Sequence, residues 1–160
     1  QNSSSPRDGR LASISGVEVG EAPGGMLAVG AHDGFERSHG IIHHRKLYLK
    51  TGGANLRGAD HLEYTGAPGE IPNLAVIRFH LHPKVTAAML ANGSVLMKIR
   101  GSRVGWNFKA DGAIAEIDNS VYFEDGVRQS SQQIVLKAVI NDIRTTGSHE
   151  VRWAFSRGTQ

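Results

Sequence analysis

The 160-residue chain has no cysteine, few aromatic residues and no long apolar run. The lack of cysteine excludes disulfide bonds and thiolate metal sites. No apolar stretch approaches the roughly 18 residues of a membrane span, so we expect no membrane association. Aromatic residues make up only 6% of the chain and arginine-rich runs are missing, so we expect no nucleic-acid partner.

Convincing helical patterns are also missing. The best helical candidate, residues 85–91, is short and follows Pro83 closely. Runs with an apolar residue at every second position are frequent instead, as in Val151, Trp153 and Phe155. Such alternation, separated by Asn-Gly and Asp-Gly turn signals, indicates half-buried antiparallel strands. The sequence therefore predicts an all-β fold, an antiparallel β-sandwich of about ten strands with no long helix.

Strand and core positions follow from the same alternation. Strands are expected near residues 11–19, 26–32, 39–50, 55–64, 74–82, 85–91, 94–100, 104–110, 113–124, 128–140 and 148–156, with one of them merged or lost. The side chains expected in the core are Phe79, Trp106, Phe108, Trp153 and either Ile134 or Val135. Residues 1–10 predict a flexible tail or linker, and residues 11–157 a single β-sandwich domain. Because the chain begins with Gln1 rather than Met, we interpret it as a processed protein or an excised fragment.

A small excess of positive charge leaves room for an anionic partner. Lys and Arg number 18 against 15 Asp and Glu, which gives a net charge of +3. Such a bias permits an anionic partner without requiring one. Most of these cations are expected to form a solvated surface.

Two histidines stand two positions apart at residues 80 and 82, a spacing that metal sites use on strands. If this segment is a strand, Phe79 points into the core, and Arg78, His80 and His82 share the opposite face. A metal site would need a third ligand nearby and no cation beside the pair. We therefore favour a polar strip that faces solvent or a partner, and we expect no metal site.

A second group of candidates lies in the segments that contain His32 and His43. His32 is interpreted either as a surface residue of an Asx-type turn or as part of a substrate-facing loop. Arg45 lies where the alternating face turns from polar to apolar, which favours a structural salt bridge with Asp33 or Asp60.

The order of motifs along the chain is more informative than any single motif. In sequence order they are a His-Asp-Gly-aromatic turn (32–35), a His-x-Arg strand (43–45), an Arg-Gly-x-Asp strand (57–60), a Phe-His-Leu-His-Pro strand (79–83), a Gly-Trp-x-Phe strand (105–108) and a closing Trp strand (151–155). Over most of residues 11–156, this series resembles the C-terminal β-domain of bacterial heparinase II/III-like proteins, in the branch common in alphaproteobacteria.

The resemblance implies a periplasmic or cytoplasmic bacterial polysaccharide lyase that pairs an upstream α/α-toroid with a C-terminal β-sandwich. Such lyases remove the proton alpha to a uronic acid carboxylate, which requires a group that neutralises the carboxylate, a general base and an acid. In the family, the catalytic Tyr and one His come from the toroid, and a metal segment opens the β-domain. Those motifs are not in this chain, so the resemblance implies no catalytic residue and no cofactor here, and leaves any metal site to the upstream part.

Two positions depart from the pattern of the family. Lys46 stands where the pattern often has a second Arg, and Ala59 stands where it often has Glu. Either change could weaken an ionic contact, and neither disturbs the fold.

Three functions remain open at this point. The leading one is a non-catalytic β-domain that forms one wall of a cleft for anionic polysaccharide, with that polymer and the upstream toroid as partners. The others are a free-standing carbohydrate-binding or interaction module, and a metal-dependent enzyme that uses His80 and His82. The candidate substrate contacts are Arg78, His80, His82, His32, His43, Arg45 and Lys46.

Overall fold

The computed structural model describes residues 12–66 and 69–158 of the chain. Within these ranges the chain forms eleven strands and two helices of four residues each, which confirms the predicted all-β fold without a long helix. The elements are β1 (Ile14–Ala22), β2 (Gly25–Phe35), α1 (Glu36–His39), β3 (Ile41–Lys50), β4 (Asn55–Tyr64), β5 (Leu74–His80), β6 (Val85–Met89), β7 (Val95–Ile99), β8 (Gly105–Asp111), β9 (Ile114–Glu124), β10 (Val127–Val139), α2 (Ile143–Thr146) and β11 (Ser148–Arg157). The tail predicted for residues 1–10 lies outside the described residues.

The expected strands all form, and none of them is merged or lost. Residues 85–91, the best helical candidate, contribute β6 instead, because the segment pairs with β7 and buries Ala87. No helix in residues 12–66 and 69–158 is long and apolar enough to cross a membrane.

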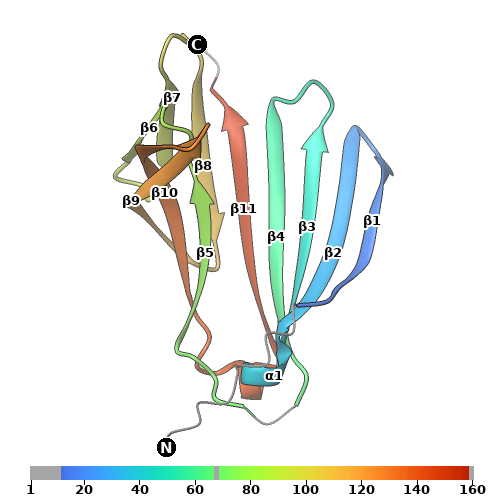
Figure 1. Cartoon of the computed structure of the whole chain (residues 1–160). Helices are drawn as coiled ribbons and strands as arrows, with labels where there is room; N and C mark the ends of the chain where they lie inside the picture. The colour runs from blue at the N-terminus through green and yellow to red at the C-terminus, as the bar shows by residue number, and fades with distance from the viewer. Residues whose placement is uncertain (1–11, 67–68, 159–160) are drawn as a thin grey trace, which may run out of the picture.

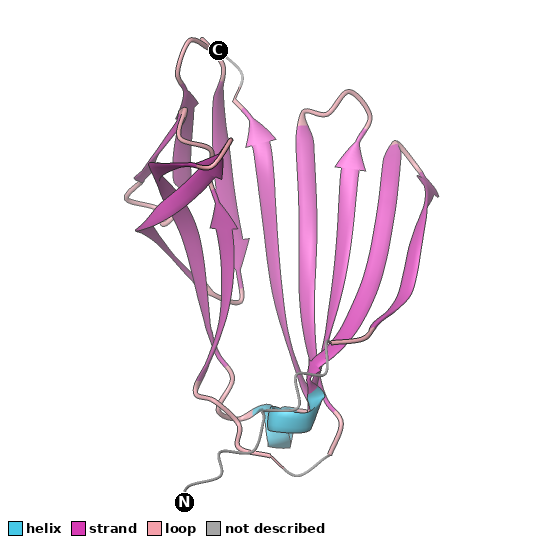
Figure 2. Ribbon diagram, viewed as in Figure 1, coloured by secondary structure: helices cyan, strands magenta, loops and turns pink. Residues whose placement is uncertain are grey.

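The strands form two sheets of very different width. The large sheet has the order β1-β2-β3-β4-β11-β8-β7-β6, and the small sheet has the order β5-β10-β9. The small sheet lies over the half of the large sheet that contains β6, β7, β8 and β11, and the strands β1, β2 and β3 extend beyond it (Figure 1). The two helices lie together at one end of the sheets (Figure 2).

The core lies between the small sheet and the half of the large sheet that it covers. Phe79 of β5 packs against Phe108 of β8 and against Trp153 and Phe155 of β11, with ring centroids 4.7 to 5.5 Å apart. Of the predicted core residues, Phe108, Ile134, Val135 and Trp153 are buried, and Phe79 and Trp106 pack against the core while partly exposed.

The position of β11 decides which residues meet in the large sheet. This last strand inserts between β4 and β8, so that Trp153 pairs with Gly58 on one side and with Ala110 on the other. The insertion brings the end of the chain beside residues about ninety positions earlier. It also completes the surroundings of a buried carboxylate on β4.

Candidate functional site

A carboxylate lies fully buried in the middle of the large sheet. Asp60 of β4 has 0% of its surface exposed, and it is among the largest fully buried side chains in the described part of the chain. A buried charge is tolerated only when it is paired and hydrogen-bonded. The side chains around Asp60 are therefore expected to pair with its charge and donate hydrogen bonds to its oxygens.

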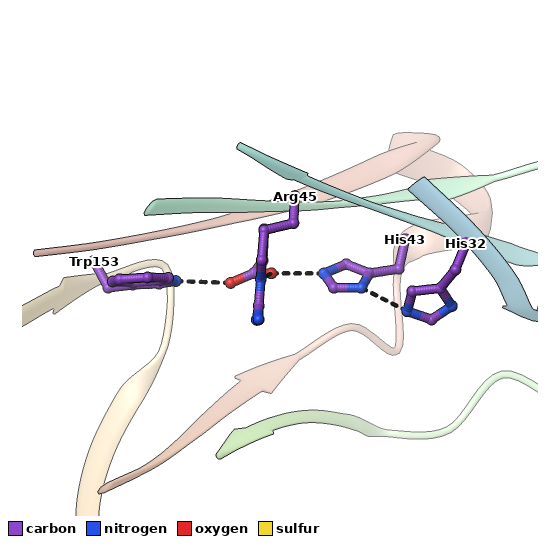
Figure 3. Close-up of polar contacts among 5 residues, drawn as sticks. His32, His43, Arg45 and Trp153 are labelled. Carbon is purple, nitrogen blue, oxygen red and sulfur yellow. Dashed lines mark hydrogen bonds and ion pairs between the residues drawn. The ribbon is translucent and has the colours of Figure 1, made fainter. Parts of the chain in front are cut away.

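Three side chains from two other strands donate to Asp60 (Figure 3). Its Oδ1 accepts from Nε2 of His43 and from Nε of Arg45, both at 2.6 Å, and its Oδ2 accepts from the indole Nε1 of Trp153 at 2.7 Å. The predicted salt bridge of Arg45 therefore forms with Asp60 and not with Asp33. The carboxyl of Asp33 instead accepts from the backbone N–H of Ser13 at 2.6 Å.

A second histidine extends this network towards the uncovered part of the sheet. Nδ1 of His43 and Nε2 of His32, which are cross-strand partners, lie 2.9 Å apart. Because a carboxylate only accepts, His43 carries its proton on Nε2, and a neutral His43 accepts at Nδ1 from Nε2–H of His32. The backbone N–H of Gly34 donates to the remaining nitrogen of His32 at 3.3 Å. With both imidazoles neutral, each ring nitrogen has a partner.

The electrostatics agree with this arrangement. Burial by itself raises the pKa of Asp60, but the hydrogen bonds from His43, Arg45 and Trp153 outweigh it and lower the pKa to about 2. Burial, and then the neighbouring His43, lower the pKa of His32 below 6.5. Asp60 and Arg45 therefore form an ion pair, and His32 resists taking up a proton.

A glycine provides the space in which the Trp153 indole reaches Asp60. A β-carbon on Gly58 would lie 2.1 Å from Cζ2 of Trp153, far inside van der Waals contact. Gly58, Asp60 and Leu62 alternate along β4 on the face that packs inwards, and all three are buried. The indole therefore lies over the backbone of β4 at Gly58 and donates to the carboxylate two positions further on.

The predicted contact residues lie on three different surfaces. His32, His43 and Arg45 share the inner face of the large sheet, which on β2 and β3 lies beyond the small sheet. Lys46 follows Arg45 on β3 and points to the outer face of the same sheet. Arg78, His80 and His82 belong to β5 and the turn after it, in the small sheet. These seven residues therefore do not form one continuous basic surface in the part of the chain that the structure describes.

On β5 the predicted alternation is confirmed. Arg78 and His80 are exposed, whereas Ile77 and Phe79 pack against the core. His80 is hydrogen-bonded through Nδ1 to Oγ of Ser120 at 2.8 Å, and the ring of His82 lies 4.9 Å from that of Tyr122. In residues 12–66 and 69–158, no three His, Cys, Asp or Glu side chains lie where they could hold a metal ion.

A hollow of about 330 Å³ lies over the inner face of β1, β2 and β3. His32, His43 and Arg45 line one part of it, and Ile14, Val17 and Leu47 are among its apolar lining residues. The apolar side chains of β1 are strongly exposed, with 74% exposure for Ile14 and 68% for Val19. The hollow therefore combines a fixed polar cluster with an uncovered apolar surface.

Sequence reasoning identified Asp60 only as one of two possible partners of Arg45, and it placed Trp153 in the core without a polar role. The signals that were present are a lone Asp on the apolar face of β4 and a Gly two residues before it. The two departures at Lys46 and Ala59 prove to be direct cross-strand partners on the outer face. They therefore concern one contact rather than two.

The fold and the buried cluster define an all-β, sandwich-like domain whose wide sheet is stabilised by an Asp-centred network. A family model described as "Heparinase II/III-like, C-terminal" matches residues 1–154, and the chain belongs to this family. "FtsZ-localized protein C" from Caulobacter vibrioides (strain NA1000 / CB15N) is 33% identical over 141 residues, which cover 84% of this chain and 24% of that protein.

Two solved structures share the fold. One, named "Heparinase III-BT4657 gene product", has a TM-score of 0.68 at 8% identity, and the match covers 93% of this chain and 22% of the chain of that structure. The other, a crystal structure of heparinase III, has a TM-score of 0.61 at 11% identity, and the match covers 91% of this chain and 21% of the heparinase III chain. The chain thus spans about a quarter of the length of these proteins.

Proposed function

We propose that this chain is the non-catalytic β-domain of a polysaccharide lyase, and that its inner face forms one wall of a cleft for a uronic-acid-containing polysaccharide. The parent protein acts on the polymer by β-elimination, with its catalytic groups in an upstream toroid. Membership of the Heparinase II/III-like C-terminal family supports the class of protein. The observation that carries the role of the chain is the way Arg45 is held beside the inner hollow.

Arg45 is positioned to recognise a carboxylate. Its Nε is fixed by Asp60, and its two terminal nitrogens make no further hydrogen bond to the described residues. The side chain keeps 39% of its surface exposed and lines the inner hollow. A guanidinium held in this way can bind an incoming carboxylate with little loss of side-chain freedom.

The imidazoles beside Arg45 are poorly suited to act as a base. Both nitrogens of His43 and both nitrogens of His32 have partners within the chain. A general base needs a free nitrogen within hydrogen-bond reach of the substrate proton. This supports recognition rather than proton abstraction as the role of the cluster.

The proposal is tested on the purified chain with heparin, heparan sulfate and alginate oligosaccharides. We expect the Arg45 guanidinium NMR signals to shift on titration and no absorbance from unsaturated uronate to develop. Turnover by the chain free of contaminants would overturn the non-catalytic role, and unshifted Arg45 signals would overturn the cleft wall. In the reading frame, a toroid directly upstream is expected.

A second candidate is a free-standing carbohydrate-binding or interaction module. The observation that favours it is the exposed apolar surface of Ile14, Val17 and Val19 on β1. A start codon near residue 1, with no toroid in the reading frame, would support the module and contradict the lyase domain.

A further inference from the structure

A second hollow, of about 540 Å³, lies on the outer face of the large sheet, where β3, β4, β11 and β8 run side by side. Its lining includes the small side chains of Ala59 on β4 and Ala154 on β11. Arg57 pairs with Ala154, and Ala59 pairs with Arg152, so each alanine stands opposite an arginine on the neighbouring strand. The hollow exists because long side chains surround two short ones.

Four cations from four neighbouring strands line this hollow. They are Lys46 of β3, Arg57 of β4, Arg152 of β11 and Lys109 of β8. The register aligns Lys46, Ala59 and Arg152 in one row across the sheet, and Arg57, Ala154 and Lys109 in the next row. Since neighbouring strands lie about 4.8 Å apart, the two cations that flank each alanine stand about 10 Å apart at their Cα atoms.

Three of these four cations form no ion pair within the described part of the chain. Arg152 forms an ion pair with Glu150 at 2.5 Å, and Nε of Arg57 donates to Oδ1 of Asn55 at 2.8 Å. Over residues 12–66 and 69–158, Lys46, Arg57 and Lys109 form no ion pair. Asp111, the acidic side chain among the lining residues, stands directly opposite Arg152 at the end of the first row. A cluster of exposed cations without ion-pair partners attracts an anionic ligand.

We propose that this hollow is a second binding site for anionic polysaccharide, separate from the inner face. The cations would contact carboxylates or sulfates of the sugar. In the next row of the same face, Asn55 and Ser156 are cross-strand partners, and their amide and hydroxyl groups suit sugar hydroxyls. The choice of a polysaccharide among polyanions rests on the proposed function, whereas the anionic character of the ligand follows from the hollow itself.

The surroundings of the hollow favour a sugar over an acidic peptide or a nucleic acid. The hollow lies in the middle of the sheet, where paired strands leave no backbone free for an added peptide strand. The hollow has two aromatic lining residues, Tyr48 and Trp153, and the ring of Trp153 is buried on the inner face of the sheet. Tyr48 alone therefore presents a ring to the hollow, and no row of aromatic rings is available on which bases could stack. Tyr48 donates its hydroxyl to the carbonyl of Pro23, which fixes the ring at the border of the hollow.

The inner and outer sites can be tested separately because they lie on opposite faces of one sheet. Arg45 reports on the inner face, and the methyl groups of Ala59 and Ala154 report on the outer hollow. An NMR titration with heparin and alginate oligosaccharides should shift both methyl signals. If only the Arg45 signals shift, the outer site is overturned and the proposed function stands. If only the methyl signals of Ala59 and Ala154 shift, the role of the inner face is overturned and the outer site stands.

Two variants test the chemistry of the outer hollow. Arg57→Ala with Lys109→Ala should weaken the oligosaccharide binding that the methyl groups report by about tenfold. It should also reduce the slope of the logarithm of the binding constant against the logarithm of the salt concentration by up to about two. Ala59→Glu keeps every cation but places a carboxylate between Lys46 and Arg152. It should abolish the titration shift at Ala154 without lowering the melting temperature, because the new side chain has a cation on each neighbouring strand.

The matched control is Arg100→Ala with Arg128→Ala, which removes the same net charge from exposed positions outside the hollow. This variant should bind as the wild-type chain does. An equal loss in the control would show that net charge alone attracts the polymer and would overturn the site. Unchanged binding by Ala59→Glu would show that the polymer does not contact the hollow and would also overturn the site. Polyglutamate or an oligonucleotide binding in the hollow as tightly as the oligosaccharides would overturn the class of ligand.

Discussion

Gly58 and Trp153 are cross-strand partners, and the indole of Trp153 lies where a side chain at position 58 would stand. The first prediction follows from this contact. Gly58→Ala should lower the free energy of unfolding by about 3 kcal/mol, since a rigid ring held by Asp60 cannot move aside without losing its hydrogen bond. Denaturant unfolding measures the effect.

Gly20→Ala provides the control for this substitution. Nothing lies within 4 Å of a β-carbon at Gly20, which is also in a strand and outside the left-handed region. Its free energy of unfolding should change by less than about 1 kcal/mol. Similar values for the two variants would contradict the role given to Gly58.

The buried carboxylate gives the second prediction. Asp60→Asn removes the charge that Arg45 faces and turns an amide group towards side chains that are themselves donors. We expect a loss of about 3 to 5 kcal/mol, the range found when one partner of a buried ion pair is removed. Glu63→Gln, which alters the exposed pair with His44, should lose less than about 1 kcal/mol. Chemical denaturation of both variants makes the comparison.

The third prediction concerns pH. Because the pKa of His32 is lowered in the folded chain, the unfolded chain takes up a proton below pH 6.5 that the folded chain does not. The free energy of unfolding should therefore fall as the pH decreases from about 6.5 towards the lowered pKa. Asp60 acts in the same direction in more acidic solution. Its contribution to the free energy of unfolding is complete above about pH 3.8 and is lost as the pH falls through about 2, the pKa of Asp60 in the folded chain.

Melting temperatures between pH 7.5 and pH 5 test the contribution of His32. In His32→Gln, which cannot take up a proton, the decline should be smaller than in the wild-type chain. NMR titration should place the imidazole pKa of His32 below 6.5. A pKa above that value would contradict the neutral arrangement of the two imidazoles.

The fourth prediction is that the chain binds no stoichiometric zinc, calcium or manganese. His80 is engaged with Ser120, His82 lies against Tyr122, and Arg78 shares the face of His80. Elemental analysis of protein purified without chelator measures the metal content. One equivalent of metal that is lost in His80→Ala would refute the prediction and support the hypothesis of a metal-dependent enzyme that uses His80 and His82.

The fifth prediction separates the small sheet from the large one in polysaccharide binding. Arg78→Ala with His80→Ala should elute earlier from a heparin column than the wild-type chain, because Arg78 and His80 are exposed on the small sheet and Arg78 is a permanent cation. The binding should be sensitive to salt, since exposed charges are screened within about 8 Å at 0.15 M ionic strength. Identical elution of the variant and the wild-type chain would show that Arg78 and His80 do not contact the polysaccharide.

The alternation of apolar and polar residues by itself determined the all-β fold and most of the core. Phe108, Ile134 and Trp153 were placed in the core correctly because side-chain direction in a strand is a local property with a period of two residues. The order of motifs also indicated the family that the comparisons show. These are inferences that need no knowledge of which strands are neighbours.

Only the tertiary structure decided which side chains meet. Asp60 and Trp153 are 93 residues apart in the chain, and they touch because β11 inserts between β4 and β8. The same strand order puts Arg78 and His32 in different sheets, and it gathers the outer cations from four strands. The physical reason is that pairing between distant strands depends on the packing of the whole chain, whereas alternation within a strand depends only on its own backbone.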